Sequence, residues 1–507
     1  MPQFMTADEA VLHVKDGDCI INNAFLAIIN PAELMGALGR RHARTGSPSN
    51  LTIYCAAGFG DWSRGSDCEA PVRSGAVKRV IASHFSSTPE TAEMAVRGDI
   101  EAYNLPLGPM SHMIRMAASN RHSYITQLGI NLFVDPKNDE YKLNPRSTEN
   151  LVEAIELDGK RQLKYNIPRF DVAFIKASSA DRSGNISFEK ECLAGDSLSV
   201  AQAVHRAGGK VIVQVERISD ARQRPWNALI PGALVDIVAI CPEQKQIAGQ
   251  GDFNPAYSGD EPLTPHEMRE MILAREQAAP KKDAARTRIA RRAAQELRKG
   301  DLVNIGVGIP EGVSTESARS GMIEDIVLTV ESGPVSGVPA SGKDFGAAIG
   351  PHSIWTTAQM FDFYDGGGLN VTFLGGLEID GHGNVNSHRS GAKLSGIGGF
   401  ANISQSTPRV VFCLSFTAGG LEIAEDAQGN VTILNEGRAP KFVEKVSTVS
   451  FSAINARSSG QQVLYVTERC VFRLGQEGLE LIEVAPGIDL NRDILQKLPF
   501  TVKVALS

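Results

Sequence analysis

The chain has 507 residues, enough for two to four domains. Its composition is that of an ordinary globular protein, and a net charge of −7 offers no basic surface to nucleic acid or acidic lipid. The first residues lack the segments of a secretory signal, and no apolar run reaches the about 18 residues of a membrane span. Seven scattered cysteines without a CxxC pair favour reduced thiols. We therefore expect a cytoplasmic protein that binds neither nucleic acid nor membranes.

Apolar runs alternate with helical segments through the first half of the chain. A short helix, a turn and a strand at 19–21 come first, and a loop then leads into a helix that begins at Pro31 with Asn30 as its cap. Further strands are predicted at 51–55, 77–81, 125–128, 172–175, 211–215 and 235–240, with a helix around 196–207. This alternation predicts a parallel sheet covered by helices.

Residues 263–299 differ in character, being helical in pattern and rich in alanine, arginine and lysine. They include the basic cluster at 280–282, Pro-Lys-Lys. The cluster could bind a phosphate, or it could lie on the solvated face of a connecting helix; the pattern favours the second interpretation. We predict a helical linker at 261–295.

The order of the predicted elements repeats after this linker. A turn at 299–301, a strand at 302–305, a glycine loop at 306–310 and a helix from Glu311 repeat the order found at 17–31. The Asp-x-x-Gly-Asn pattern that begins at Asp181 also recurs, at Asp380. Two landmarks in the same order predict two domains of one fold, at about 1–260 and 296–507.

A carboxylate follows the most apolar strand of the second half. Residues 326–330 form an unbroken apolar and β-branched run, and Glu331-Ser-Gly-Pro ends it. Glu331 is thus expected at the carboxyl end of a buried strand, where open α/β sheets bind ligands. The residue could be a nucleophile or a satisfied structural carboxylate. Glu216 ends a similar strand, but Arg217 beside it favours a structural ion pair there.

Glycine loops lie near several predicted strand ends of the second half, at 306–308, 366–368 and 396–399. Each could be a plain turn, but together they suggest an extended ligand that contacts the backbone. His382 and His388 flank Gly383-Asn384, a weak pattern for metal ligands, and we expect no metal site.

The segment 329–334, Thr-Val-Glu-Ser-Gly-Pro, followed by Gly-Val-Pro-Ala at 337–340, resembles the active-site segment of family I coenzyme A transferases. The likeness is to the single-chain acyl-CoA:acetate/3-ketoacid, or propionate-type, group. It extends over nearly the whole chain, through segments at 133–136, 184–187, 361–369, 383–386, 398–405 and 416–421.

The resemblance implies two similar open α/β domains in tandem, with mostly parallel sheets, helices on both sides and the active site between them. It implies an enzyme that takes CoA from an acyl-CoA and gives it to a small carboxylic acid, in short-chain fatty acid or ketone-body metabolism. No cofactor would be permanently bound, and the protein would be a homodimer or homotetramer.

The resemblance also assigns roles to residues. Glu331 would attack the thioester carbonyl, giving a mixed anhydride and then a γ-glutamyl-CoA thioester. Backbone of Gly398 and Gly399 would lie near the thioester. The residues expected to contact CoA are Gly306, Val307, Gly308, Gly375 and Asn384.

The first half departs from the family pattern. Where relatives have a glycine-rich loop, this chain has Asn22, Asn23 and Phe25, and Leu107 replaces a glutamine that donates a hydrogen bond to the oxyanion. Asn22 or Asn23 could supply that donor, or the substrate differs, or the reaction is no longer transfer. The alternatives to a CoA-transferase are a hydrolase of a CoA thioester or other CoA-linked substrate and a CoA-binding subunit without turnover.

Overall fold

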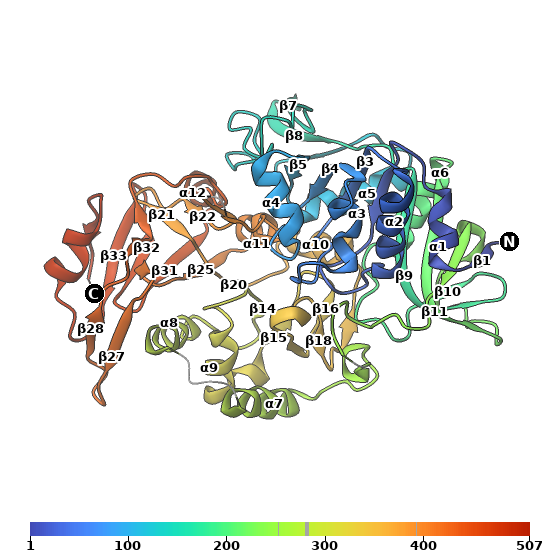
Figure 1. Ribbon diagram of the computed structural model, residues 1–507. Helices are drawn as coiled ribbons and strands as arrows, with labels where there is room; N and C mark the ends of the chain where they lie inside the picture. The colour runs from blue at the N-terminus through green and yellow to red at the C-terminus, as the bar shows by residue number, and fades with distance from the viewer. Residues whose placement is uncertain (252, 279–282, 392, 507) are drawn as a thin grey trace.

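Two large sheets, each covered by helices, form the molecule. The computed structural model describes residues 1–251, 253–278, 283–391 and 393–506. Figure 1 shows the first sheet in blue and green and the second in yellow to red, with the two chain ends at opposite extremes of the molecule. This is the predicted fold class, α/β with mostly parallel sheets and helices on both sides.

The first sheet has eight strands in its main path, and every pairing along that path is parallel. Its strands in spatial order are β1 (Gln3–Met5), β13 (Ile237–Ile240), β11 (Lys210–Ser219), β9 (Val172–Asp181), β2 (Cys19–Asn22), β3 (Leu51–Cys55), β4 (Val77–Ala82) and β5 (Glu101–Asn104). The short strands β10 (Ile186–Ser187) and β12 (Ala228–Ile230) extend it from β9.

Alternate residues of these strands face two separate cores, because side chains point to opposite faces of a strand in turn. Ile21 and Ile175 pack with α5 (Leu107–Ala118) and α6 (Ser197–Arg206) on one face. Ile20 and Phe174 pack with α1 (Ala7–Ala10), α2 (Ala32–Thr45), α3 (Ala70–Arg73) and α4 (Pro89–Arg97) on the other. Burial on both faces explains why the strands read as continuous apolar runs.

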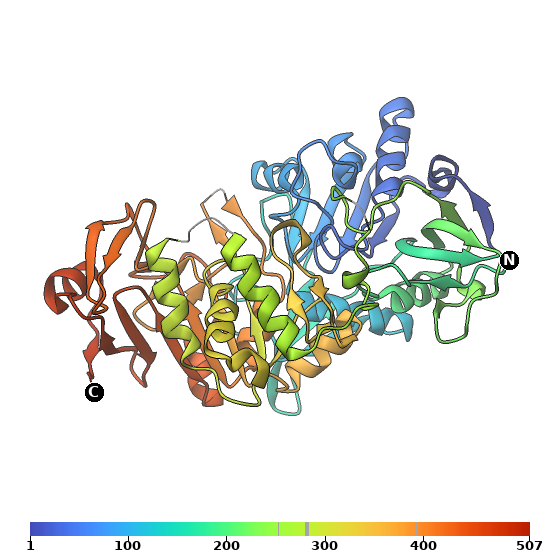
Figure 2. The same ribbon diagram turned by 90° about the horizontal axis from the view of Figure 1, so that it is seen from below.

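The second sheet has ten strands; its central pairs are parallel, the pairs on either side are antiparallel, and its last pair is again parallel. Its strands in spatial order are β19 (Ser353–Ile354), β16 (Pro334–Val335), β15 (Val327–Thr329), β14 (Leu302–Ile305), β20 (Val371–Leu374), β25 (Arg409–Cys413), β31 (Gln462–Val466), β32 (Cys470–Leu474), β33 (Leu479–Val484) and β34 (Lys503–Val504). The helices α7 (Pro265–Ala278), α8 (Ala284–Ala294) and α9 (Gly312–Ser320) lie together on one side of it, as Figure 2 shows.

The remaining elements are short and lie around both large sheets. The helices are α10 (Thr357–Asp365), α11 (Phe400–Ser406) and α12 (Ala453–Ser459), of which α10 and α11 lie where the two halves meet (Figure 1). The small sheets pair β17 (Val338–Pro339) with β18 (Ala348–Ile349), β21 (Glu378–Asp380) with β22 (Val385–Asn386) and β30 (Phe442–Val443), β23 (Arg389–Ser390) with β24 (Lys393–Leu394), β26 (Thr417–Ala418) with β29 (Ala439–Pro440), β27 (Glu422–Glu425) with β28 (Val431–Asn435), and β6 (Ser123–Thr126) with β8 (Lys160–Asn166) and β7 (Val152–Leu157).

The internal repeat predicted from two Asp-x-x-Gly-Asn patterns is a repeated hairpin. Asp181 accepts backbone N–H bonds from the residues two and four positions later, and its other oxygen accepts from the Asn185 side chain at 2.9 Å. Asp380 repeats all three bonds, with Asn384 at 3.0 Å. Each turn joins two antiparallel strands, β9 to β10 and β21 to β22. The limits of the two domains and of the linker remain a prediction.

Some local expectations differ from the structure. The strand expected at 125–128 is β6, which belongs to a small antiparallel sheet and not to the parallel one. Asn30 does not cap α2, because its side chain donates to the carbonyls of Leu26 and Phe59, both at 2.8 Å. The strand expected at 326–330 is the shorter β15, which pairs with β14 on one side and with the antiparallel β16 on the other. The basic cluster at 280–282 lies outside the described residues.

Candidate active site

The order in which the chain adds strands to the second sheet reverses at β14, and a cavity lies at that point. The chain passes from β14 to β15 on one side and returns to β20 on the other, so the carboxyl ends of these strands border a crevice. A cavity of about 380 Å³ lies there, lined by Gly306 and Val307 after β14, Glu331 after β15 and Gly375 after β20. The residue that the sequence singled out thus lies at a topological switch point.

A tight turn fixes Glu331. The Gly333 N–H donates to the carbonyl of Val330 at 3.0 Å, and the Ser332 hydroxyl donates to the carbonyl of Gly346 at 2.5 Å. Gly333 has a φ of +141°, and a Cβ there would lie 2.1 Å from the carbonyl oxygen of Trp355, so no other residue fits. This explains the glycine of the Glu-Ser-Gly-Pro segment.

The Glu331 carboxylate is largely withdrawn from water. Burial raises its pKa, while its own backbone N–H and the Asn304 side chain oppose that rise by hydrogen bonding to the charged form. No cation of the described chain forms an ion pair with it. Glu216 provides the contrast, because Lys190 contacts it at 2.8 Å. A poorly solvated carboxylate without a counter-charge suits a nucleophile better than a structural role.

The glycine segment after β24 lies between Glu331 and the first half of the chain. A Cβ on Gly399 would lie 3.3 Å from Cγ of Glu331, and one on Gly396 would lie 2.5 Å from the carbonyl oxygen of Ser83. The Gly398 N–H donates to that Ser83 carbonyl at 2.9 Å and is therefore occupied. The Gly399 N–H, in contrast, has no acceptor among the described residues.

His84 is a cavity residue that sequence reasoning missed. It lines the same cavity as Glu331, and its Nε2 lies 2.8 Å from the Ser86 hydroxyl. Its Nδ1 is buried and has no partner in the described part of the chain. Burial lowers its pKa to about 4, so the ring is neutral at pH 7. Its position just past the carboxyl end of β4 is the one sequence signal that could have indicated it.

Two cations also line this cavity, and neither was predicted. Arg286 comes from α8, and Lys441 lies just before β30 and donates to the carbonyl of Gly376 at 2.9 Å. The pKa of Lys441 is lowered to about 8, chiefly by burial; the charge of Glu468 opposes this effect and that of Arg286 adds to it. The cavity therefore combines one carboxylate with two cationic side chains.

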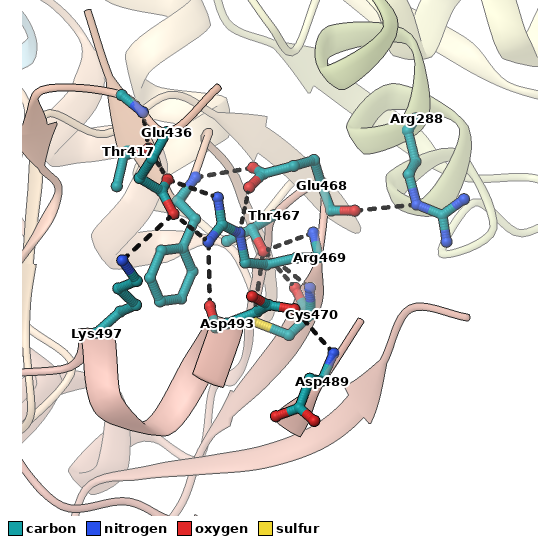
Figure 3. Close-up of polar contacts among 12 residues, drawn as sticks. Arg288, Thr417, Glu436, Thr467, Glu468, Arg469, Cys470, Asp489, Asp493 and Lys497 are labelled. Atoms are coloured by element: carbon teal, nitrogen blue, oxygen red, sulfur yellow. Dashed lines mark hydrogen bonds and ion pairs between the residues drawn. The ribbon is translucent and has the colours of Figure 1, made fainter. Parts of the chain in front are cut away.

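A buried ion cluster, shown in Figure 3, is connected to the backbone of Lys441 through Phe416. Arg469 is wholly buried and contacts Glu468 at 2.6 Å and Glu436 at 2.9 Å. Glu468 also accepts the backbone N–H of Phe416 at 2.8 Å, and the Arg469 guanidinium lies 4.5 Å from the Phe416 ring centre. The backbone N–H of Lys441 donates to the Phe416 carbonyl. The cluster, by fixing Phe416, therefore also fixes the backbone at Lys441.

The loop that departs from the family pattern does not line this cavity. Asn22, Asn23, Phe25 and Leu107 instead line a separate void of only about 10 Å³. The Asn23 side chain donates to the Ser197 hydroxyl at 2.7 Å. Nδ2 of Asn22 is buried without a partner among the described residues, so of the two asparagines it is the one with a free donor.

Phe25 of this loop and Leu107 at the start of α5 both contact the second half of the chain. A Cβ on Gly346 would lie 2.7 Å from the Phe25 ring, and the Leu107 N–H donates to the Gly398 carbonyl at 3.0 Å. Both side chains belong to the same apolar cluster as Val338 of β17. The loop thus packs the two halves together at a point next to the cavity.

Other predicted contact residues have structural partners. The Gly308 N–H donates to Glu311 at 3.1 Å, and Asn384 is held in the hairpin turn by Asp380. Neither lines the Glu331 cavity, and the glycines at 366–368 follow the end of α10 away from it. His388 is bonded to Ser450 at 2.7 Å, and the described residues contain no group of three or more metal-ligating side chains.

Comparison with known proteins identifies the family. The profile described as Coenzyme A transferase matches residues 4–240 and 286–491. The chain belongs to the coenzyme A transferase family. It is 38% identical over 501 residues to Acetate CoA-transferase YdiF of Escherichia coli O157:H7, covering 98% of this chain and 92% of that one. It is 37% identical over 517 residues to Caffeate CoA-transferase of Acetobacterium woodii, covering 100% and 95%.

A solved structure confirms the fold. The E. coli O157:H7 acyl-CoA transferase YdiF, in a thioester complex with CoA, aligns with a TM-score of 0.90 and 36% identity over 100% of this chain and 94% of that one. The chain is a CoA-transferase that works on acyl-CoA, as the resemblance implied. The hydrolase alternative finds no support, since these relatives are named transferases. No helix in the described ranges is long and apolar enough to cross a membrane.

Proposed function

We propose that this CoA-transferase moves CoA between an acyl group and a carboxylic acid through a thioester on Glu331. The observation that carries the proposal is the partly dry, unpaired Glu331 carboxylate at the switch-point cavity, against Gly399. The hydrogen bond from Asn304 favours the charged, nucleophilic form and opposes the rise in pKa that burial causes.

Each half-reaction is balanced without a metal or ATP. The γ-carboxylate attacks the thioester carbonyl, the C–S bond breaks, and an acyl-glutamyl anhydride and CoA thiolate form. The thiolate then attacks the γ-carbonyl and expels the acyl group as a carboxylate, leaving glutamyl-CoA. The acceptor acid then takes CoA from glutamyl-CoA by the same two steps in reverse, which gives the new acyl-CoA and restores the Glu331 carboxylate. The covalent intermediate divides one difficult exchange into two easier ones.

The cations orient CoA. Arg286 and Lys441 line the cavity that holds Glu331, and phosphate groups of CoA are the anionic part of the substrate. We place those phosphates at this pair, which leaves the pantetheine arm to run past Gly375 and Gly306 towards Glu331. Backbone glycines allow a narrow arm to approach closely.

The oxyanion of each tetrahedral intermediate needs hydrogen-bond donors. The Gly399 N–H and Nδ1 of His84 are unpartnered in the described chain and belong to residues lining the Glu331 cavity. We propose that these two groups take the place of the glutamine that Leu107 replaces. Asn22 carries a free donor too, but it borders the separate void.

Isotope exchange tests the proposal. The wild type is expected to exchange a labelled carboxylic acid with its own acyl-CoA. Glu331→Gln should lower the rate at least about 10⁴-fold because the nucleophile is lost. Glu216→Gln, at a comparable strand end but ion-paired with Lys190, is the matched control and should keep the wild-type rate. Full activity in Glu331→Gln would refute the proposal.

The cytoplasmic location and the dimeric or tetrameric state stay predictions.

A further inference from the structure

A second cavity, of about 250 Å³, adjoins the loop that follows β14. It is bounded by α7, the first turn of α9 and β17. The residues that line it include the apolar Ile272, Ile305 and Val338 and the small polar Ser314 and Ser341. We call it the side cavity.

The side cavity meets the Glu331 cavity at Val307 and Phe345, whose side chains line both. Val307 is 54% exposed, which is high for an apolar residue at the junction of two cavities. A bound apolar group lying across this junction would cover that side chain, and burying such area is favourable.

The other neighbouring space is too small for an acyl group. The void beside Asn22 measures about 10 Å³, and Phe25 and Leu107 close it. Of these two neighbouring spaces in the described part of the chain, the side cavity is the one with room for a group larger than a few atoms.

Charge separates the roles of the two cavities. Glu276 and Glu311 line the side cavity together with Arg275, whereas Arg286 and Lys441 line the Glu331 cavity. The polyanionic part of CoA is favoured beside the two cations of the Glu331 cavity. In the side cavity Glu276 is ion-paired with Arg319, so the charges there offer CoA phosphates no comparable attraction, and an uncharged tail needs none.

We propose that the side cavity is the acyl subsite, and that the acids handled by this enzyme are monocarboxylic acids with an apolar or aromatic tail. The volume admits a tail of on the order of eight non-hydrogen atoms, at about 30 Å³ each. This inference rests on the proposed function of Glu331, since the tail is placed relative to a thioester there.

The first half-reaction, in which the protein takes CoA from an acyl-CoA, tests the subsite because it needs no acceptor acid. The enzyme is mixed with octanoyl-CoA or acetyl-CoA, and the rate at which the protein gains the mass of CoA is followed at several donor concentrations. Ser314→Phe on α9 and Ser341→Phe after β17 fill the side cavity from two different walls. Ser320→Phe, at the exposed end of α9, is the matched control.

Both filled variants should lower the octanoyl-to-acetyl ratio of kcat/KM at least about tenfold, in the range expected when a pocket rejects added methylenes. The control should keep the wild-type ratio. An unchanged ratio in both filled variants overturns the subsite, as does an equal rise of KM for both donors, which would place CoA itself there. A wild type that reacts with acetyl-CoA but not octanoyl-CoA also overturns it. Absence of a CoA adduct from every donor would instead refute the proposed function.

Discussion

Lys441 makes CoA binding depend on pH in a way that the structure specifies. Burial lowers the pKa of this ammonium from its usual 10.5 to about 8, so the group is about 90% charged at pH 7 and about 10% charged at pH 9. The proposed phosphate contact needs the charged form. The apparent Kd scales inversely with the charged fraction, and acyl-CoA should therefore bind about tenfold more weakly at pH 9 than at pH 7.

Calorimetric titration of Glu331→Gln with acetyl-CoA measures this affinity without turnover. In that background Lys441→Met should bind more weakly at pH 7, by about 10- to 150-fold for a lost charged hydrogen bond, and its Kd should not change up to pH 9. Lys441→Arg keeps the charge and should bind with a nearly constant Kd over the same range. A Kd that is flat with Lys441 present, or that weakens equally in Lys441→Met, would refute the reasoning.

Further predictions concern the ion cluster, the nucleophile's environment and the oxyanion donors. Arg469→Met should lower the thermal unfolding midpoint strongly, since a buried carboxylate left unpaired costs about 3–5 kcal/mol, whereas the exposed ion-paired Arg473→Met should cost at most about 1 kcal/mol. Asn304→Leu removes a hydrogen bond that lowers the pKa of Glu331, so that pKa should rise. Because activity is lost as the pH falls through the pKa of Glu331, the acid limb of the kcat/KM profile should move to higher pH. His84→Leu should reduce kcat about 10²–10³-fold, and Asn22→Leu should leave it nearly unchanged; the reverse order would place the oxyanion donor in the other void.

Local patterns predicted the parts of the site that lie next to each other in sequence. Glu331 could be placed because an apolar run followed by Glu-Ser-Gly-Pro is a buried strand and its turn. The repeated Asp-x-x-Gly-Asn pattern marks a hairpin turn that occurs twice, and it misled about Asn384. The pattern recurs because it builds a hairpin turn, and its asparagine is occupied there.

The remaining cavity residues come together only through the tertiary fold. His84 follows a strand of the first sheet, Arg286 lies on α8, and Lys441 follows strand β29 of a small sheet. No spacing in the sequence connects them. The short antiparallel strands at the edge of the second sheet were also missed, because their pairing depends on partners formed by the core strands.

The most direct test of the central claim is to locate the covalent intermediate. The wild type is incubated with acyl-CoA in the absence of an acceptor acid, treated with borohydride to reduce the thioester to an alcohol, digested and analysed by peptide mass spectrometry. The account predicts reduction at Glu331, in the peptide that contains Glu331-Ser332-Gly333-Pro334, and none in Glu331→Gln. Transfer at the full rate with no modification of Glu331, or with a modification at another residue, would contradict it.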